Sequence, residues 1–106
     1  MIEPGAPRSL HVKNCSTDYI TVMWTRPASD GGSSITSYII ERRDMSRPTW
    51  LKVGEVGADC TEFKATSLSA GAKYSFRVYA VNKVGQSKQA AELDQPCKAK
   101  TPFGQF

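Results

Sequence analysis

The chain has 106 residues, 40% of them hydrophobic, and carries 14 Lys and Arg against 10 Asp and Glu, for a net charge of +4. This length fits one domain with one modest core. The chain has no apolar run of the roughly eighteen residues that a transmembrane helix needs, and its first ten residues have no apolar segment typical of a signal peptide. The basic residues are mostly scattered, so we expect neither nucleic acid nor a membrane as a partner.

Apolar residues alternate with other residues at period two along most of the chain, and no helical period persists. This alternation is typical of strands that bury one face. The last predicted strand is interrupted at Pro96. The predicted strands, in chain order, cover residues 10–12, 20–24, 35–44, 50–56, 63–68 and 74–80, followed by the two parts of the last strand, 86–93 and 97–101.

Turn-forming residues separate these strands about every ten residues. The clearest turns are ASDGGSS at 28–34, MSRPT at 45–49, SAG at 69–71 and NKVG at 82–85. Seven short strands with this spacing indicate two antiparallel sheets packed face to face rather than a parallel sheet. The sequence therefore predicts an all-β fold, a seven-stranded antiparallel Ig-like sandwich.

The three cysteines are too few and too far apart for a recognisable disulfide or zinc pattern. Cys15, Cys60 and Cys97 cannot all pair within the chain, and no CxxC motif occurs. We expect the three cysteines to act as small hydrophobic residues at strand ends, and the protein to be in a reducing compartment. Asn14 begins an Asn-Cys-Ser glycosylation acceptor, which would be used only if the parent protein were secreted.

The ordered set of core and turn residues resembles a fibronectin type III domain from Pro7 to about Lys100. Trp24 lies in VMWTRP and Tyr38 in SYII, and the longest motif runs from Leu68 to Ser87. This motif reads Leu68-x-x-Gly71-x-x-Tyr74-x-Phe76-Arg77-Val78-x-Ala80-x-Asn82-x-x-Gly85-x-Ser87.

The resemblance and the residue types together predict the core. Trp24 is expected to fill the centre between the sheets, and the Tyr74 hydroxyl to bond a backbone group upstream, as in a tyrosine corner. Ala65 stands where the family usually has a branched aliphatic residue, so either Phe63 or Cys60 fills the space beside it or a small cavity remains. The predicted structural core is Trp24, Tyr38, Leu68, Tyr74, Phe76 and Val78.

A narrower resemblance is to the type III domains of giant sarcomeric proteins such as titin, twitchin and myosin-binding protein C. It rests on DGGS at 30–33, ITSYIIERRD at 35–44, Trp50 and AVNKVGQS at 80–87. It implies a cytoplasmic, sarcomeric spacer and docking platform, one unit of a tandem array. The implied partners are myosin or other thick-filament proteins, and neighbouring Ig-like or type III domains of the same chain.

The same resemblance sets the expected boundaries of the domain. Residues 1–6 are expected to be a linker, residues 7–101 the domain, and residues 102–106 a linker to a following domain. Two other parents stay open. One is a cell-surface receptor or adhesion protein, with this chain as an ectodomain module, and the other is a giant cytoplasmic kinase, with this chain as an accessory domain.

No motif predicts catalysis, a metal site or a cofactor. His11 is the only histidine and is expected on the outer side of a strand, without triad or metal partners. The best candidate for a partner-binding surface is the outer face of the second sheet, with a possible ion pair between Glu41 and Arg77. Its predicted residues are Arg43, Trp50, Arg77 and Tyr79.

Overall fold

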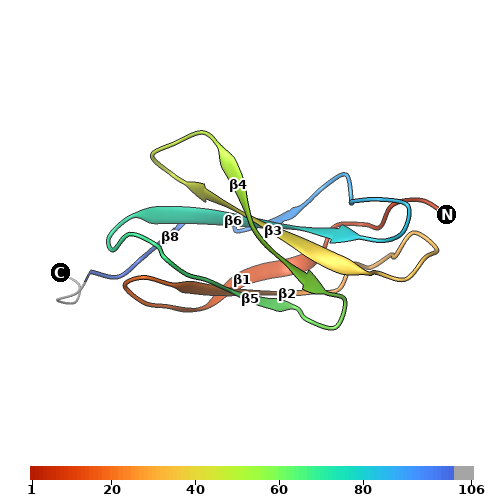
Figure 1. Cartoon of the computed structure of the whole chain (residues 1–106), viewed down its shortest axis with the longest axis horizontal. Helices are drawn as coiled ribbons and strands as arrows, with labels where there is room; N and C mark the ends of the chain where they lie inside the picture. Colours follow the sequence, from red (N-terminus) through yellow and green to blue (C-terminus); the bar gives the residue numbers. More distant parts are fainter. Residues whose placement is uncertain (102–106) are drawn as a thin grey trace.

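The computed structural model describes residues 1–101, which form strands and loops and contain no helix (Figure 1). The linker predicted at residues 102–106 lies outside the described residues. The strands are β1 (Arg8–Cys15), β2 (Ile20–Thr25), β3 (Ser37–Asp44), β4 (Trp50–Gly57), β5 (Glu62–Ala65), β6 (Lys73–Val81), β7 (Ala91–Glu92) and β8 (Cys97–Lys98).

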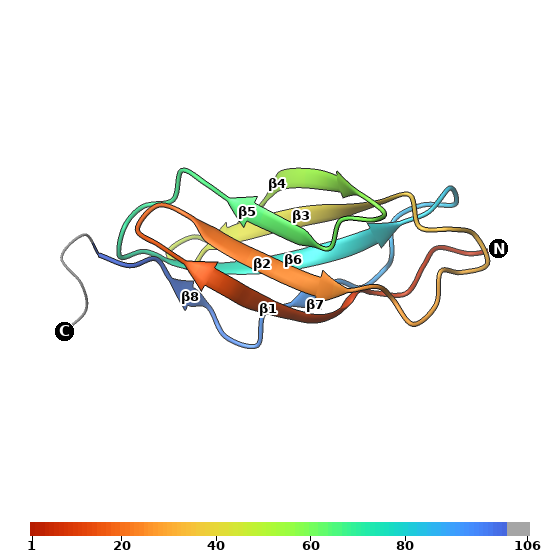
Figure 2. The same ribbon diagram turned by 90° about the horizontal axis from the view of Figure 1, so that it is seen from below.

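The strands form two antiparallel sheets that pack face to face, which confirms the predicted sandwich. One sheet has the order β1-β2-β5, and the other has the order β4-β3-β6-β7, with β8 also paired to β6. The molecule is elongated, and β8 lies near the end opposite to the N-terminus (Figures 1 and 2). The ends of the described chain therefore point away from each other along the long axis.

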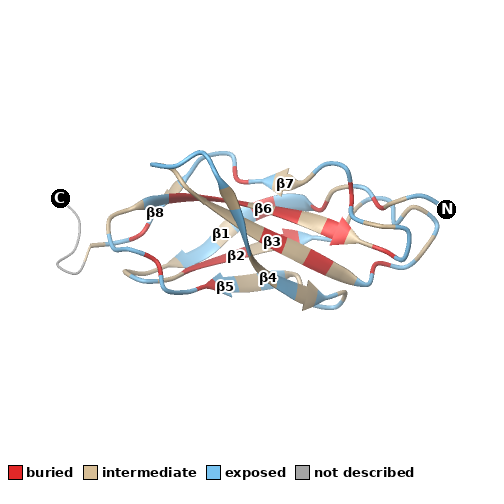
Figure 3. Ribbon diagram, turned by 45° about the horizontal axis from the view of Figure 1, so that its top comes forward, coloured by how far each residue is buried: buried red, intermediate tan, exposed pale blue. Residues whose placement is uncertain are grey.

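The core lies between the sheets and follows the period-two alternation of the strands. Figure 3 shows buried and partly exposed positions alternating along β3 and β6. The Trp24 ring meets the Tyr38 ring edge to face, with centroids 5.5 Å apart, a favourable aromatic arrangement. Burial raises the pKa of the Tyr38 hydroxyl. Trp24, Tyr38, Leu68, Tyr74, Phe76 and Val78 are all buried.

The loop between β5 and β6 is tied to the core by Tyr74. Its hydroxyl oxygen accepts a hydrogen bond of 2.8 Å from the backbone N–H of Ser69, the geometry that a tyrosine corner requires. Gly71 turns the chain back toward β6 with φ of +79°, a conformation that glycine adopts without steric cost. Strand β5 ends at Ala65 rather than at residue 68, because Ser67 has a left-handed φ of +60°.

A close contact between Phe63 and Gly54 joins the open edges of the two sheets. Ile40 pairs with Gly54 and Glu41 with Lys52, so Val53 is an extra residue in a β-bulge. A Cβ at Gly54 would overlap the Phe63 ring. Phe63 is therefore the bulky side chain at this edge, close to the buried Ala65. Cys60, the other residue considered for this space, is exposed.

The last strand is more broken than the sequence predicts. Its two parts shrink to β7 and β8, on either side of Pro96, and residue 86 contributes only an isolated bridge to Val81. The Ser87 hydroxyl accepts a hydrogen bond from the Ala80 N–H and donates one to the Gln89 carbonyl. The Ser87 side chain thus accepts the hydrogen bond that a backbone carbonyl of a paired strand would otherwise accept from Ala80.

Candidate functional site

The predicted outer-face residues come from three adjacent strands of the larger sheet. Arg43 on β3 lies opposite Trp50 on β4, and Glu41 lies opposite Arg77 on β6. Tyr79 follows two residues after Arg77, so both side chains are on the same face of β6. The structure therefore brings Trp50, Arg77 and Tyr79 together around one guanidinium.

Arg77 is the centre of this cluster. Its guanidinium carbon lies 4.3 Å from the centroid of the Trp50 ring and 5.4 Å from that of Tyr79, within the range of cation–π attraction. Its Nε donates to the Glu41 carboxylate at 2.6 Å, and both side chains are only about a quarter exposed, at 26% and 21%. The Arg77 charge is thus already matched within the sheet.

Arg43 lies beside this cluster but is bonded elsewhere. Its Nε donates at 2.8 Å to the backbone carbonyl of Arg47, across the turn between β3 and β4. This bond fixes the turn and leaves the remaining N–H groups of the guanidinium for other contacts. We call these four residues of one sheet face the outer-face patch: Arg43, Trp50, Arg77 and Tyr79.

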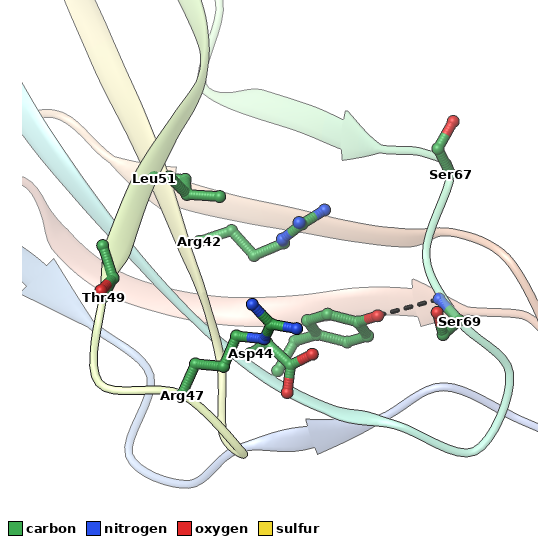
Figure 4. A pocket seen from close by; sticks show the side chains of 8 residues that line it. Arg42, Asp44, Arg47, Thr49, Leu51, Ser67 and Ser69 are labelled. Carbon is green, nitrogen blue, oxygen red and sulfur yellow. Dashed lines mark hydrogen bonds between the residues drawn. The ribbon is translucent and has the colours of Figure 1, made fainter.

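A second site, not predicted from the sequence, lies where the turn after β3 faces the loop between β5 and β6. It is a pocket of about 470 Å³, which we call the arginine pocket. Figure 4 shows Arg42, Thr49 and Leu51 on one side and Ser67 and Ser69 across from them. Its lining residues are Arg42, Asp44, Arg47, Thr49, Leu51, Ser67, Ser69 and Tyr74.

The Arg42 side chain lies near the Tyr74 ring and has no ion pair with any described residue. Its guanidinium carbon lies 5.2 Å from the centroid of the Tyr74 ring. Its Nε is buried and makes no hydrogen bond with any described residue. Within residues 1–101, neither Arg42 nor Arg47 forms a salt bridge. Two guanidinium groups of this pocket are therefore free of direct acidic partners.

Asp44 is the one acidic residue of the pocket, and its carboxylate is held by Ser46. The Ser46 N–H and hydroxyl both donate to the Asp44 Oδ1, at 2.9 and 2.8 Å. These bonds are the main cause that lowers the pKa of the Asp44 carboxyl, and the charges of Arg47 and Arg42 add to it. Asp44 is consequently ionised at neutral pH and offsets one of the two arginine charges.

The sequence held a signal for this pocket. By the period-two rule, Arg42 lies on the same face of β3 as the buried Tyr38 and Ile40. A charged side chain on the inward face of a strand, such as Arg42, needs either a charged or polar partner or contact with solvent. Its position therefore indicates a polar pocket at this end of β3.

The segment before β1, predicted as a linker, is hydrogen-bonded to loops at the N-terminal end of the molecule. The Ile2 N–H donates to the Gly31 carbonyl, and the Gly5 N–H donates to the Ser29 carbonyl, both at 2.9 Å. The buried Asn82 donates its side-chain N–H groups to the carbonyls of Ile2 and Asp30, both at 2.8 Å. One amide side chain thus joins three separate segments of the chain.

Two further features hold this segment in place. A Cβ at Gly31 would overlap the Ile2 carbonyl, and Gly31 has φ of +75°, so only glycine fits there. Glu3 forms an ion pair of 3.5 Å with Lys88. The bond from its own backbone N–H is the largest cause that lowers the pKa of the Glu3 carboxyl, with Lys88 contributing less.

His11 is the single histidine of the sequence and lies on β1. His11 is exposed, and its Nδ1 lies 2.8 Å from the carbonyl of Ser9. No cluster of three His, Cys, Asp or Glu side chains suited to a metal ion exists within residues 1–101. The described residues also include no helix long and apolar enough to cross a bilayer.

The cysteines differ from one another in their surroundings. Cys15 and Cys97 pack against the core at the ends of β1 and β8, as expected, whereas Cys60 is exposed in a turn. Burial, together with the neighbouring Cys15 thiol, raises the pKa of the Cys97 thiol to about 11.

Comparison with known proteins places this fold in a family. The family model described as "Fibronectin type III domain" matches residues 5–95. Titin of Drosophila melanogaster is 37% identical over 86 residues, which is 81% of this chain and a share of titin that rounds to 0%. Human cardiac-type myosin-binding protein C is 34% identical over 100 residues, 94% of this chain and 7% of that protein.

A solved structure agrees with these sequence matches. The twitchin kinase region of C. elegans has a TM-score of 0.88 and 32% identity, covering 98% of this chain and 18% of that one. This chain therefore spans only a small fraction of the relatives it matches. The family match and the sandwich topology lead to one conclusion: this chain belongs to the fibronectin type III domain family.

Proposed function

We propose that this chain is one unit of a tandem array in a giant muscle protein, where it acts as a spacer and docking platform in the cytoplasmic sarcomere. In this proposal, residues 7–101 form the domain, and residues 1–6 and 102–106 connect it to its neighbours. The module itself is non-catalytic and needs no cofactor. Similarity to titin and to myosin-binding protein C over most of the chain supports this context.

The observation that carries the proposal is the bonded N-terminal segment. A connecting segment that is hydrogen-bonded to two loops cannot swing freely, so it transmits the orientation of one domain to the next. Ile2 and Val84 are exposed apolar side chains, at 62% and 48%. They suit contact with a preceding Ig-like or type III domain.

The proposed partners of the docking surface are proteins, with myosin or other thick-filament proteins first. The outer-face patch supplies Trp, Tyr and Arg side chains, the types that most often dominate interface energies.

A second candidate is an accessory domain beside a kinase. The similarity to the twitchin kinase region over 98% of this chain favours it. In that setting the same rigid joint would position the kinase relative to its neighbours.

An antibody against this domain tests the proposal on the endogenous parent protein. We expect a very large band on a high-mass gel that glycosidase does not shift, and regular striping in muscle sections. A mid-sized, glycosidase-sensitive band at cell margins would instead indicate a receptor ectodomain, glycosylated at the exposed Asn14. Kinase peptides in the immunoprecipitated band would favour the second candidate.

A further inference from the structure

The arginine pocket has the composition of an anion-binding site. It combines two guanidinium groups that form no salt bridge with any residue in the described range 1–101, and three hydroxyl side chains, those of Thr49, Ser67 and Ser69. Guanidinium groups bind carboxylates and phosphates through charge-assisted, often bidentate hydrogen bonds. We propose that this pocket binds the carboxylate of an acidic side chain in an extended segment of a partner protein.

The charge of the pocket favours a carboxylate over a phosphate. Arg42 and Arg47 are positive and Asp44 is negative, which leaves a net charge of +1. A single carboxylate neutralises this charge. A doubly charged phosphate would leave an excess negative charge close to Asp44, at a cost that grows as water is excluded.

The shape of the site favours an extended peptide as the source of the carboxylate. Leu51 lies directly opposite Arg42 in the sheet and is 53% exposed, which offers an apolar contact to the stem of a Glu side chain. Strand β4 is the end strand of its sheet. An extended segment can add to such an edge and place alternate side chains over the pocket.

Arg42 is also prepared for binding. Its guanidinium carbon lies 5.2 Å from the centroid of the Tyr74 ring, and its Nε is buried without a partner among the described residues. Less side-chain entropy is lost when an already packed side chain binds, and the terminal N–H groups of the guanidinium remain to donate to a carboxylate. This inference rests on the proposed docking role and assigns it a second surface, separate from the outer-face patch.

A titration with matched peptides tests the carboxylate. We would add the capped peptide Ac-Lys-Val-Glu-Val-Lys-amide to the isotope-labelled protein and follow the backbone amides by NMR. We expect shifts concentrated at Leu51, Ser67 and Ser69, and binding roughly tenfold weaker when Gln replaces Glu, since a charge-assisted bond is lost. Equal binding of the Gln peptide, or no shift up to about 10 mM peptide, overturns the proposal. If a phosphoserine peptide binds more tightly than the Glu peptide, the preferred ligand is a phosphate and the carboxylate proposal is overturned.

Charge variants of the pocket provide the second test. Arg47→Gln keeps the backbone hydrogen bonds of residue 47 and should lower the affinity for the Glu peptide about tenfold. Asp44→Asn keeps the acceptor for the Ser46 N–H, removes the repulsion and should strengthen binding roughly two- to fivefold. Lys83→Gln removes one positive charge from the far end of the domain and is the control. If Arg47→Gln and Lys83→Gln lose the same affinity for the Glu peptide, the loss reflects the net charge of the domain rather than the pocket, and the proposal is overturned.

The peptide-binding test of the arginine pocket and the antibody test of the proposed array can fail separately. Peptide binding by the arginine pocket is measured on the single domain, so it can fail while the antibody still shows a striated giant protein. Conversely, a receptor-like parent would overturn the sarcomeric role and leave the pocket titration unchanged.

Discussion

The Tyr74 hydroxyl is one of the contacts that tie the loop between β5 and β6 to the core. Tyr74→Phe removes the acceptor of the Ser69 N–H while keeping the buried ring. We expect the free energy of unfolding to fall by about 1–3 kcal/mol, because a donor near the core loses its partner. Urea denaturation of both proteins measures this difference in the free energy of unfolding. Tyr79→Phe is the matched control, and an equal loss in both variants would contradict the role given to Tyr74.

Gly54 is required by its neighbour rather than by its own backbone. Gly54→Ala places a Cβ within the Phe63 ring, and overpacking of this kind costs about 1–3 kcal/mol. Gly57→Ala, in the same strand, is the control, because nothing lies within 4 Å of its added Cβ. Thermal unfolding should show a lower Tm for Gly54→Ala alone. Phe63→Leu in the same chain should recover part of the loss, as coupled neighbours do.

The surroundings of the three thiols predict an order of reactivity. The pKa of the Cys97 thiol is raised to about 11 by burial and by Cys15, so little of the reactive thiolate is present at pH 8. Iodoacetamide should modify the exposed Cys60 well before Cys97, as followed by peptide mass spectrometry. Equal rates at both positions would contradict the assigned burial.

The same shift predicts how stability changes at high pH. The Cys97 thiol has a higher pKa in the folded chain than the reference value of 9.0. The folded state therefore holds this proton more tightly, and stability falls as the pH rises from about 9 toward 11. Cys97→Ser should flatten this part of the profile of Tm against pH.

At the scale of elements, the larger sheet carries a surface that three strands build together. Trp50 on β4, Arg77 on β6 and Tyr79 on β6 meet around one guanidinium. Replacing Arg43, Trp50 and Tyr79 together by Ala should weaken co-sedimentation with myosin, because the large contact side chains are lost. The core is untouched, so the free energy of unfolding should change by no more than about 2 kcal/mol.

A matched triple variant on the other sheet controls for general surface effects. His11 and Met23 pair across β1 and β2, and Lys64 lies on β5. Replacing these three by Ala removes comparable bulk from the opposite face. If both triple variants bind myosin like the unchanged domain, the outer-face patch has no part in that contact.

Sequence reasoning succeeded where one face of a strand is buried. Period-two alternation predicts which face of the sheet each residue of β3 and β6 occupies, because a slip by one residue would turn Tyr38 and Ile40 out of the core. It therefore also predicts that Glu41 and Arg77 share the outer face, where the observed register pairs them. The core residues followed from this rule together with the resemblance to the fibronectin type III family.

The rest depended on contacts between distant segments. The arginine pocket needs the turn after β3 to face Ser67 and Ser69, and no local pattern gives that distance. The early end of β5 depends on the left-handed Ser67, and the broken last strand on the Ser87 hydroxyl. Such features are decided by side chains and backbone meeting across the fold, which propensity does not encode.

At the scale of the whole molecule, the chain enters at one end of a long sandwich, and its last strand, β8, lies near the other (Figure 2). Such a unit extends an array along its own long axis when its joints are rigid. The entering joint depends on Asn82, which is buried and binds the carbonyls of Ile2 and Asp30. In the proposed array, the rigidity of this joint therefore rests in part on an amide side chain that is distant from residues 1–6 in sequence.

Asn82→Asp tests this joint without altering the turn that follows it. The carboxylate can still accept from the N–H groups of Val84 and Gly85, but it cannot donate to the carbonyls of Ile2 and Asp30. Instead it faces them with a negative charge, so we expect residues 2–5 to detach. Amide hydrogen exchange at Ile2 and Gly5 should rise at least tenfold relative to the β6 amides, since a loss of more than about 1.4 kcal/mol corresponds to that factor.

The matched control keeps the donor chemistry of the side chain but moves it. Asn82→Gln retains both N–H groups on a longer side chain, so it separates the loss of the donors from the loss of their position. If exchange at Ile2 and Gly5 stays slow in Asn82→Asp, the backbone bonds to Ser29 and Gly31 suffice to hold the segment. The joint would then owe its rigidity to the loop ASDGGSS, and Gly31→Ala, which overlaps the Ile2 carbonyl, would be the variant that releases it.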